Sequence, residues 1–291
     1  MKKAKHLIEY ALFIFVMQIC AWLPLDKASA FVGWLGRNTG PFLRRSQRAE
    51  NNLEMVFPEL DKRQIRLLVK DMWDNLGRVF AEYPHLEEIG KNRVTIENAE
   101  HLEKLIHEDG PAVFVSAHTG NWEISGPAIK MLYDHNIDPV YRAPNNPYVD
   151  KKIAKFRGLN GKMSSFAKSS RGARDLVKAL KNNRHVAIIF DQKYNQGPLI
   201  RFFGVPAKTS TAFADLALKF KCPVVPGFVV RDKGAHFKLC LYPPISLQRS
   251  DGSDLSAEEI IAQANTLLEE LIRRHPSQWL WLHRRWPHRQ T

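Results

Sequence analysis

The sequence contains little of what defines several common protein classes. Its three cysteines, Cys20, Cys222 and Cys240, are scattered and odd in number, so they form neither a disulfide scaffold nor a paired metal-binding motif. The GxSxG pattern of serine hydrolases does not occur. No internal repeat or low-complexity linker is present either. We therefore expect the cysteines to be small buried apolar residues of an ordinary globular protein.

Acidic residues are also scarce. Asp and Glu number 30 against 43 Lys and Arg, which gives a formal net charge of +13 and an isoelectric point near 9.7. A surplus of this size favours anionic partners, namely nucleic acid, phospholipid headgroups or an acidic protein. The hydrophobic fraction of 44% excludes a disordered chain. A length of 291 residues suffices for one large domain or two small ones.

One long apolar run lies near the N-terminus. Residues 7–25 are almost wholly apolar, and a helix of this length would span about 28 Å, close to the hydrocarbon thickness of a bilayer. Three interpretations are open: a signal peptide cleaved near Ala30, a transmembrane anchor, or a helix in the headgroup plane. Lys and Arg flank the run on both sides, so the positive-inside rule does not fix its orientation. We favour membrane association, with residues 1–30 forming a membrane-associated helix.

The rest of the chain, residues 31–291, is expected to form a single α/β domain. Residues 31–90 have apolar positions at helical spacing, and from about residue 94 short apolar runs alternate with helical patterns. This alternation predicts a mostly parallel or mixed sheet covered by helices on both faces. The predicted strands are residues 112–117, 139–142, 185–191, 223–230 and 235–241, and the predicted helices end at residue 133 or span residues 171–182, 209–220 and 257–272.

A histidine and a glutamate follow the first buried strand. His118 and Glu123 are separated by Thr-Gly-Asn-Trp, and on a continuous helix they would point in different directions. Gly120 permits a turn between them, and Asn121 is a suitable N-cap for the helix that follows. We expect Glu123 to reach back to one imidazole nitrogen of His118 and to leave the other nitrogen free as a base.

The segment from His118 to Glu123 resembles the HX4(D/E) motif of the lysophospholipid acyltransferase superfamily. It is most similar to the late acyltransferases of lipid A biosynthesis, and the similarity covers nearly the whole chain. Further matching segments are Asn52-Leu53, Phe57-Pro58-Glu59, residues 141–145, Phe190-Asp191-Gln192, Phe202-Phe203-Gly204, Val224-Val225-Pro226, residues 278–281 and Arg284-Arg285-Trp286.

This resemblance implies an enzyme that transfers a fatty acyl chain from acyl carrier protein to a hydroxyl of a lipid A precursor in lipopolysaccharide biosynthesis. It implies the bacterial inner membrane as the location, with the catalytic domain on the cytoplasmic side, and neither a cofactor nor a metal. The functional positions of the family fall on His118, Glu123, Arg142 and Asp191. Arg201 departs from the pattern, because many members carry an apolar residue there.

The reaction explains why these residue types are needed. An acceptor hydroxyl becomes a good nucleophile when a base such as His118 takes its proton during attack on the thioester carbonyl. The oxyanion that forms requires donors, which we expect to be backbone amides at the start of the Asn121 helix, or Arg142. Arg142 also suits a phosphate of the acceptor. We expect Asp191 to position Arg142 or an acceptor hydroxyl.

Simpler interpretations stand beside these. Arg142 is equally compatible with a paired surface charge, and Asp191 with a cap of the next turn. Ser116 and His118 would share one face of a strand, as in a hydrolase, but the nucleophile motif is missing. Residues 283–289 are basic and contain a tryptophan, a pattern found in nucleic-acid sites and at membrane interfaces. The apolar N-terminus favours the membrane.

Two alternative functions remain open at this point. In the first, the same chemistry acts on a lysophospholipid or another glycolipid. In the second, the chain is a basic membrane- or nucleic-acid-binding module without catalysis. We expect a membrane partner and no nucleic acid.

Overall fold

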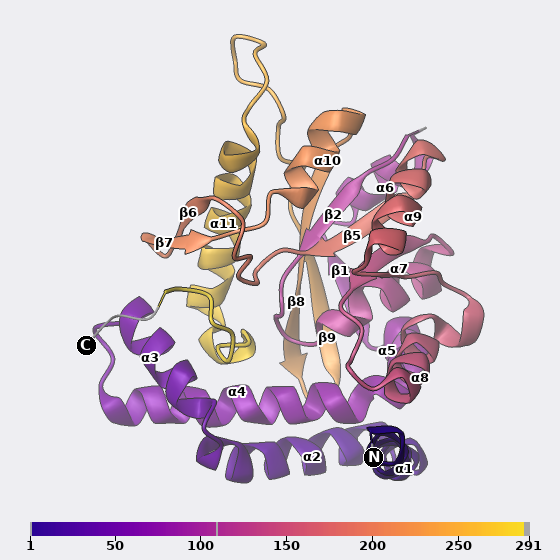
Figure 1. The fold of residues 1–291 in the computed structure, drawn as a ribbon, viewed down its shortest axis with the longest axis vertical. Coiled ribbons are helices and arrows are strands. Elements are labelled where there is room, and N and C mark those ends of the chain that lie inside the picture. Colours follow the sequence, from indigo (N-terminus) through magenta and orange to yellow (C-terminus); the bar gives the residue numbers. More distant parts are fainter. Residues whose placement is uncertain (1, 109, 288–291) are drawn as a thin grey trace.

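The computed structural model describes residues 2–108 and 110–287, which form a layered α/β structure (Figure 1). The central sheet has seven strands in the order β1-β9-β8-β2-β5-β3-β4, and β6 and β7 form a separate hairpin. β8, β2, β5, β3 and β4 run parallel, and β9 is antiparallel to β8. The strands are β1 Val94–Glu97, β2 Val113–Ser116, β3 Ile137–Tyr141, β4 Phe166–Ala167, β5 His185–Ile189, β6 Leu199–Phe202, β7 Val205–Lys208, β8 Val224–Lys233 and β9 His236–Leu241.

Helices cover both faces of the sheet, as the sequence predicts. Successive side chains of a strand point to opposite faces, so Val113 and Val115 of β2 join one core cluster while Phe114 joins the other. Side chains of α9 (Ser170–Lys181), α10 (Ala212–Phe220) and α11 (Ala257–Arg274) complete the first cluster. Those of α5 (Leu86–Asn92), α6 (Glu100–His107) and α7 (Ser125–Tyr133) complete the second.

Three helices form a layer across the carboxyl ends of the parallel strands. In Figure 1, α4 (Lys62–Glu82) passes below the tip of β8, α2 (Leu25–Thr39) runs along α4, and α1 (Lys2–Trp22) lies at the end of α2. The α2–α4 contact is close because glycines line it. A Cβ on Gly36 would lie 2.4 Å from the carbonyl oxygen of Trp73, and one on Gly77 would lie 2.4 Å from that of Val32.

The first helix is apolar and largely exposed. It is the one helix in the described part of the chain that is long and apolar enough to cross a membrane, and 11% of its most apolar window is buried. Its buried side chains, Met17 and Cys20, lie on one side, where Cys20 packs with Ala28 and Ala81. The first helix ends at Trp22, and Leu23 and Pro24 separate it from α2. The predicted boundary after residue 30 therefore falls inside α2.

The predicted elements agree with the structure, but several further elements were not predicted. The predicted strands and helices are confirmed with ends within about three residues, and residues 31–90 are helical. The strands β1, β4, β6 and β7 and the helices α6 and α8 were not predicted. The other helical segments are η1 Gly40–Phe42, α3 Ser46–Val56, η2 Tyr83–His85, η3 Trp122–Ile124, α8 Pro147–Arg157, η4 Leu159–Gly161 and η5 Pro276–Gln278.

Candidate active site

Three neighbouring parallel strands deliver candidate residues to one edge of the sheet. His118 follows β2, Asp191 follows β5 and Arg142 follows β3, and these strands are adjacent and parallel. Because the carboxyl ends of parallel strands share an edge, this is where open α/β sheets bind ligands. The predicted placement of these residues at a common edge is therefore confirmed.

His118 is bound by Asp191. The imidazole Nδ1 lies 2.8 Å from Asp191 Oδ1, and the backbone amide of His118 donates to Asp191 Oδ2 at 2.9 Å. The indole of Trp279 donates a further hydrogen bond to Oδ2 at 2.8 Å. An ionised carboxylate only accepts, so Nδ1 carries the imidazole proton. In the neutral imidazole the lone pair is therefore on Nε2, which lies 3.3 Å from the side-chain amide nitrogen of Gln192.

Charge and hydrogen bonding keep the Asp191 carboxylate ionised. Burial opposes ionisation, but the charge and the hydrogen bonds of His118 outweigh it, and the pKa of Asp191 lies well below its ordinary value. The ring of His283 lies 4.9 Å from that of His118. Burial, with the charge of His118, lowers the pKa of His283 to about 4. His283 is therefore neutral near pH 7 and adds no positive charge beside the base.

Glu123 does not contact His118, and the prediction of a direct hydrogen bond between them is wrong. Both of its carboxylate oxygens accept from the guanidinium of Arg157 at 2.6 Å, and Oε1 also accepts from the Tyr83 hydroxyl at 2.7 Å. Burial opposes ionisation of Glu123, but the hydrogen bonds and charge of Arg157 and the Tyr83 bond lower its pKa overall.

Trp122 stands between the two residues of the motif. Its ring packs edge-on against His118 with centroids 4.9 Å apart, and its indole donates to Glu123 at 3.0 Å. The physical reason for the correction is the short helix η3, which begins at Trp122. It turns Glu123 toward η2 and α8, while the His118 ring stays at the end of β2 against Asp191.

Asn121 is an N-cap, as predicted, but it is fully buried and does not face a substrate. Its Oδ1 accepts from the Glu123 amide at 3.1 Å, and its Nδ2 donates to Glu82 at 2.8 Å. The amide of Ile124 donates to the Asn121 carbonyl. The amides of Glu123 and Ile124 are thus already bonded and do not serve as the predicted oxyanion donors.

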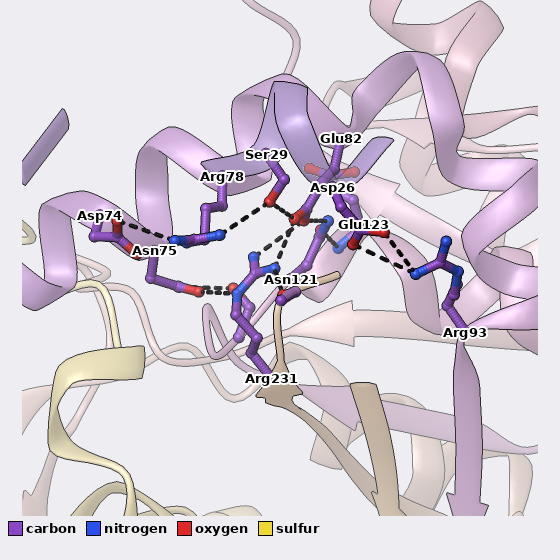
Figure 2. Close-up of polar contacts among 12 residues, drawn as sticks. Asp26, Ser29, Asp74, Asn75, Arg78, Glu82, Arg93, Asn121, Glu123 and Arg231 are labelled. Atoms are coloured by element: carbon purple, nitrogen blue, oxygen red, sulfur yellow. Dashed lines mark hydrogen bonds and ion pairs between the residues drawn. The ribbon is translucent and has the colours of Figure 1, made fainter. Parts of the chain in front are cut away.

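A buried ion pair of Glu82 with Arg231 lies against the turn and contacts Asn121 (Figure 2). Glu82 is fully buried and accepts from the guanidinium of Arg231 at 2.6 and 3.0 Å, and from the Ser29 hydroxyl at 2.7 Å. Asn75 accepts from Arg231 at 2.9 Å and donates to the carbonyl of Gly120 at 2.8 Å. Sequence analysis did not single out this cluster, because its members lie on three separate elements.

Gly120 is required where it stands. Its φ is +52°, and a Cβ there would lie 2.6 Å from the carbonyl oxygen of Val229. Its amide donates to the Gln278 carbonyl at 3.0 Å. The expected glycine turn is therefore present, and it is held between β8 and the C-terminal segment.

The arginine that contacts the motif in the structure is Arg157 and not Arg142. Arg142 is exposed at the end of β3, and in residues 2–108 and 110–287 it has neither an ion pair nor a side-chain hydrogen bond. Arg157, which was not predicted, holds Glu123 and lies 5.2 Å over the ring of Tyr141. The signal that could have identified α8 is Asn146 before Pro147, a typical helix start. It would have placed Arg157 on this helix.

The basic C-terminal segment is mostly internal. Arg285 is fully buried and donates to the Lys208 carbonyl and to Thr209, and Trp286 donates to the Phe202 carbonyl. The predicted surface patch is wrong for these two residues, so they offer neither a nucleic-acid site nor a membrane contact. His288 and Arg289 lie outside the described residues. Arg201 lies on β6 and donates to the Gly204 carbonyl, away from His118.

Comparisons with known proteins agree on one family. The model of the bacterial lipid A biosynthesis acyltransferases matches residues 1–288. A lipid A biosynthesis acyltransferase of Haemophilus influenzae is 27% identical over 87% of this chain and 81% of its own length. The lipid A biosynthesis lauroyltransferase of Escherichia coli K12 is 27% identical over 83% and 79%, and the palmitoleoyltransferase of that organism is 23% identical over 91% and 87%.

Solved structures also align with this chain, and one of them is an acyltransferase. It is the 1-acyl-sn-glycerophosphate acyltransferase of Thermotoga maritima, with a TM-score of 0.37, 16% identity, and coverage of 94% of this chain and 97% of that one.

Proposed function

Because the chain belongs to the bacterial lipid A biosynthesis acyltransferase family and is an acyltransferase, we propose that it transfers a fatty acyl chain from acyl carrier protein to a hydroxyl of a lipid A precursor. The family match agrees with the motifs of the sequence. The relatives act in lipid A biosynthesis by name, and their names specify different acyl chains. The observation that carries the mechanism is the His118 ring, which is fixed by buried Asp191 with its other nitrogen at the ligand-binding edge.

His118 is the general base of this reaction. Its Nε2 takes the proton of the acceptor hydroxyl as the oxygen attacks the thioester carbonyl carbon. The tetrahedral intermediate collapses with cleavage of the carbon–sulfur bond, and the imidazolium returns the proton to the departing thiolate. The products are an ester and a free thiol, and the base is restored. The Asp191 carboxylate fixes the tautomer and stabilises the imidazolium, which is the role first expected of Glu123.

Gln192 is the best-placed oxyanion donor. Its side-chain amide nitrogen lies 3.3 Å from His118 Nε2, the atom that the acceptor hydroxyl must approach. An entering hydroxyl displaces this contact and leaves the amide free to donate to the developing oxyanion. Arg142, exposed at the same edge, is suited to a phosphate of the acceptor, because its guanidinium presents several donors in one plane.

The N-terminal layer suits a membrane surface. Exposed apolar side chains lie along α1 and also on α2, where Phe31 and Trp34 are each 58% exposed. We place the protein at the inner membrane with the catalytic edge on the cytoplasmic side. α1 contacts the body along its length, from the His6 carbonyl, which accepts from Asn146, to buried Cys20. This favours a helix lying along the membrane surface.

A cleaved signal peptide fits the structure poorly. Cleavage after Ala30 would cut α2 within its helical span and remove Ser29, which is buried and bonded to Glu82. Membrane fractionation in high salt tests this: the full-length protein should remain in the pellet. A shorter soluble form that begins at residue 31 would restore the signal-peptide interpretation.

The proposed reaction is tested with the full-length protein in phospholipid vesicles, a purified acyl carrier protein thioester and a lipid A precursor. Mass spectrometry should show one added ester-linked acyl chain. His118→Ala should abolish most of the product, and His107→Ala, an exposed histidine of α6, should not. Acylation of a lysophospholipid in place of the lipid A precursor would overturn the acceptor, and normal turnover by His118→Ala would overturn the mechanism.

A further inference from the structure

The positive charge of the chain is concentrated in one segment. Residues 151–184 contain eleven Lys or Arg and a single acidic residue, Asp175, a surplus of ten within a total net charge of +13. This segment includes most of α8 and all of α9. Three of these cations, Arg157, Lys162 and Arg184, pair with acids outside the segment. The remaining surplus gives this part of the surface a local positive field.

Four cations form a stripe along α9. Arg171, Arg174, Lys178 and Lys181 are spaced by three, four and three residues, so they share one face of the helix. All four are exposed, whereas the opposite face packs into the core. In the part of the chain that the structure describes, the ion pair among them is that of Arg171 with Asp175 at 3.8 Å, on the surface. A pair of this kind contributes little, so the stripe remains available to a partner.

The stripe begins beside the active site. Lys168, just before α9, donates its backbone amide to the Tyr141 carbonyl at the end of β3. Its ammonium lies 5.7 Å over the ring of Tyr194. Tyr194 belongs to the loop that carries Gln192 and Asp191 past His118. The first turn of α9 therefore adjoins the loop that borders the catalytic base.

The stripe also leads away from the apolar layer. In Figure 1, α9 is on the right of the sheet, and α8 lies between it and the layer of α1 and α2 at the bottom. A surface in this position faces water when α1 and α2 lie against a bilayer. Its charge therefore suits a soluble acidic protein better than lipid headgroups.

We propose that the basic stripe of α9 is the docking surface for the acyl carrier protein that donates the acyl chain. This rests on the proposed function and specifies where the donor binds. Acyl carrier protein is strongly acidic, and complementary charge raises the encounter rate and fixes the orientation of the complex. A carrier docked on α9 presents its thioester at the N-terminal end of α9, beside Gln192 and His118.

The test compares two charge-reversal double variants of the full-length protein. Arg174→Glu with Lys178→Glu removes the centre of the stripe, and Lys104→Glu with Lys219→Glu makes the same charge change on exposed residues of α6 and α10. With the acyl carrier protein donor at low salt, the α9 variant should lose about 10- to 100-fold in kcat/KM, mainly through KM. Added salt should weaken the wild type and narrow this difference. The matched control should behave as the wild type.

Three outcomes would contradict the proposal, and they can be told apart. A wild-type enzyme that uses acyl-coenzyme A but not the carrier protein would refute the donor in the proposed function itself. A wild type that uses the carrier, with an unchanged α9 variant, would refute only the docking surface. Loss of binding to phosphatidylglycerol vesicles by the α9 variant, with carrier kinetics intact, would make the stripe a lipid-binding surface. An acyl-pantetheine donor, which lacks the protein, should be used equally by all variants.

Discussion

The two ends of the turn from His118 to Glu123 have opposite electrostatic arrangements. At one end, His118 is bound by a buried anion, Asp191, and keeps one nitrogen at the ligand edge. At the other end, Glu123 is itself the buried anion, and Arg157 and Tyr83 occupy its oxygens. In the proposed mechanism the first end transfers a proton, whereas the ion pair at the second end holds the turn in place. The spacing from His118 to Glu123 therefore places two residues at the ends of one turn without a hydrogen bond between them.

The largest effect should follow from removing the base itself. His118→Ala should lower kcat by about 10²–10⁴-fold, the usual contribution of general-base catalysis. Adding Asp191→Ala should lower kcat only slightly further, because the two residues act as one unit. Steady-state kinetics with saturating donor measures this. A double variant whose losses multiply would mean that Asp191 has a separate role.

Asp191→Asn should be next in size, at about 10²-fold in kcat. The amide can donate to Nδ1, which moves the imidazole proton to Nε2 and leaves no lone pair facing the substrate. Binding of the acyl donor, measured as KM, should change little. A variant with normal kcat would show that the carboxylate does not set the tautomer.

Breaking the pair at the other end should mainly reduce stability. Glu123→Ala should cost about 3–5 kcal/mol, because it leaves the largely buried Arg157 cation without an acidic partner. The loss in kcat should be smaller, about tenfold, and Arg157→Ala added to it should cost little more. Glu87→Ala breaks the exposed pair with Lys162 and is the matched control, with an expected cost below about 1 kcal/mol.

The pH dependence of this pair has a defined sign. The folded-state pKa of Glu123 is lowered, and the pKa of Glu in an unfolded chain is about 4.3. The ion pair therefore stabilises the protein above that pH and loses its contribution as the pH falls through the lower folded-state value. The difference in Tm between wild type and Glu123→Ala should shrink below about pH 4. A constant difference would mean that Glu123 is not ionised in the folded protein.

The smallest effect should come from removing the hydrogen bond of Asn75 to the Gly120 carbonyl. Asn75→Ala removes the donor to the Gly120 carbonyl and the acceptor for Arg231, at a cost of about 1–3 kcal/mol. Activity of the folded fraction should fall by only about two- to threefold, because the ion pair of Glu82 with Arg231 remains. A loss as large as that of Asp191→Asn would show that the turn depends on this amide for its catalytic geometry.

Local patterns were sufficient for most of the fold. Strands such as β2 and β5 are apolar on both faces and follow Gly, Pro or Asn signals, so their positions and the shared edge of His118 and Asp191 could be predicted. The partners of the site could not. Arg157 is one of several cations in its segment, and Glu82 is one glutamate near the end of a long helix. Only the packing of α4 and α8 against the turn singles out these two.

Ser29 and Glu82 also limit how this enzyme can be shortened. The hydroxyl of Ser29, on the helix with exposed Phe31 and Trp34, binds the same carboxylate that holds Arg231 and Asn121. The Gly36–Gly77 contact then joins this helix to α4 backbone to backbone. A water-soluble version made by deleting the apolar N-terminus therefore has to end the deletion before α2. Removing α2 as well would expose the face of α4 that α2 covers and would take the Ser29 donor from the Glu82 carboxylate.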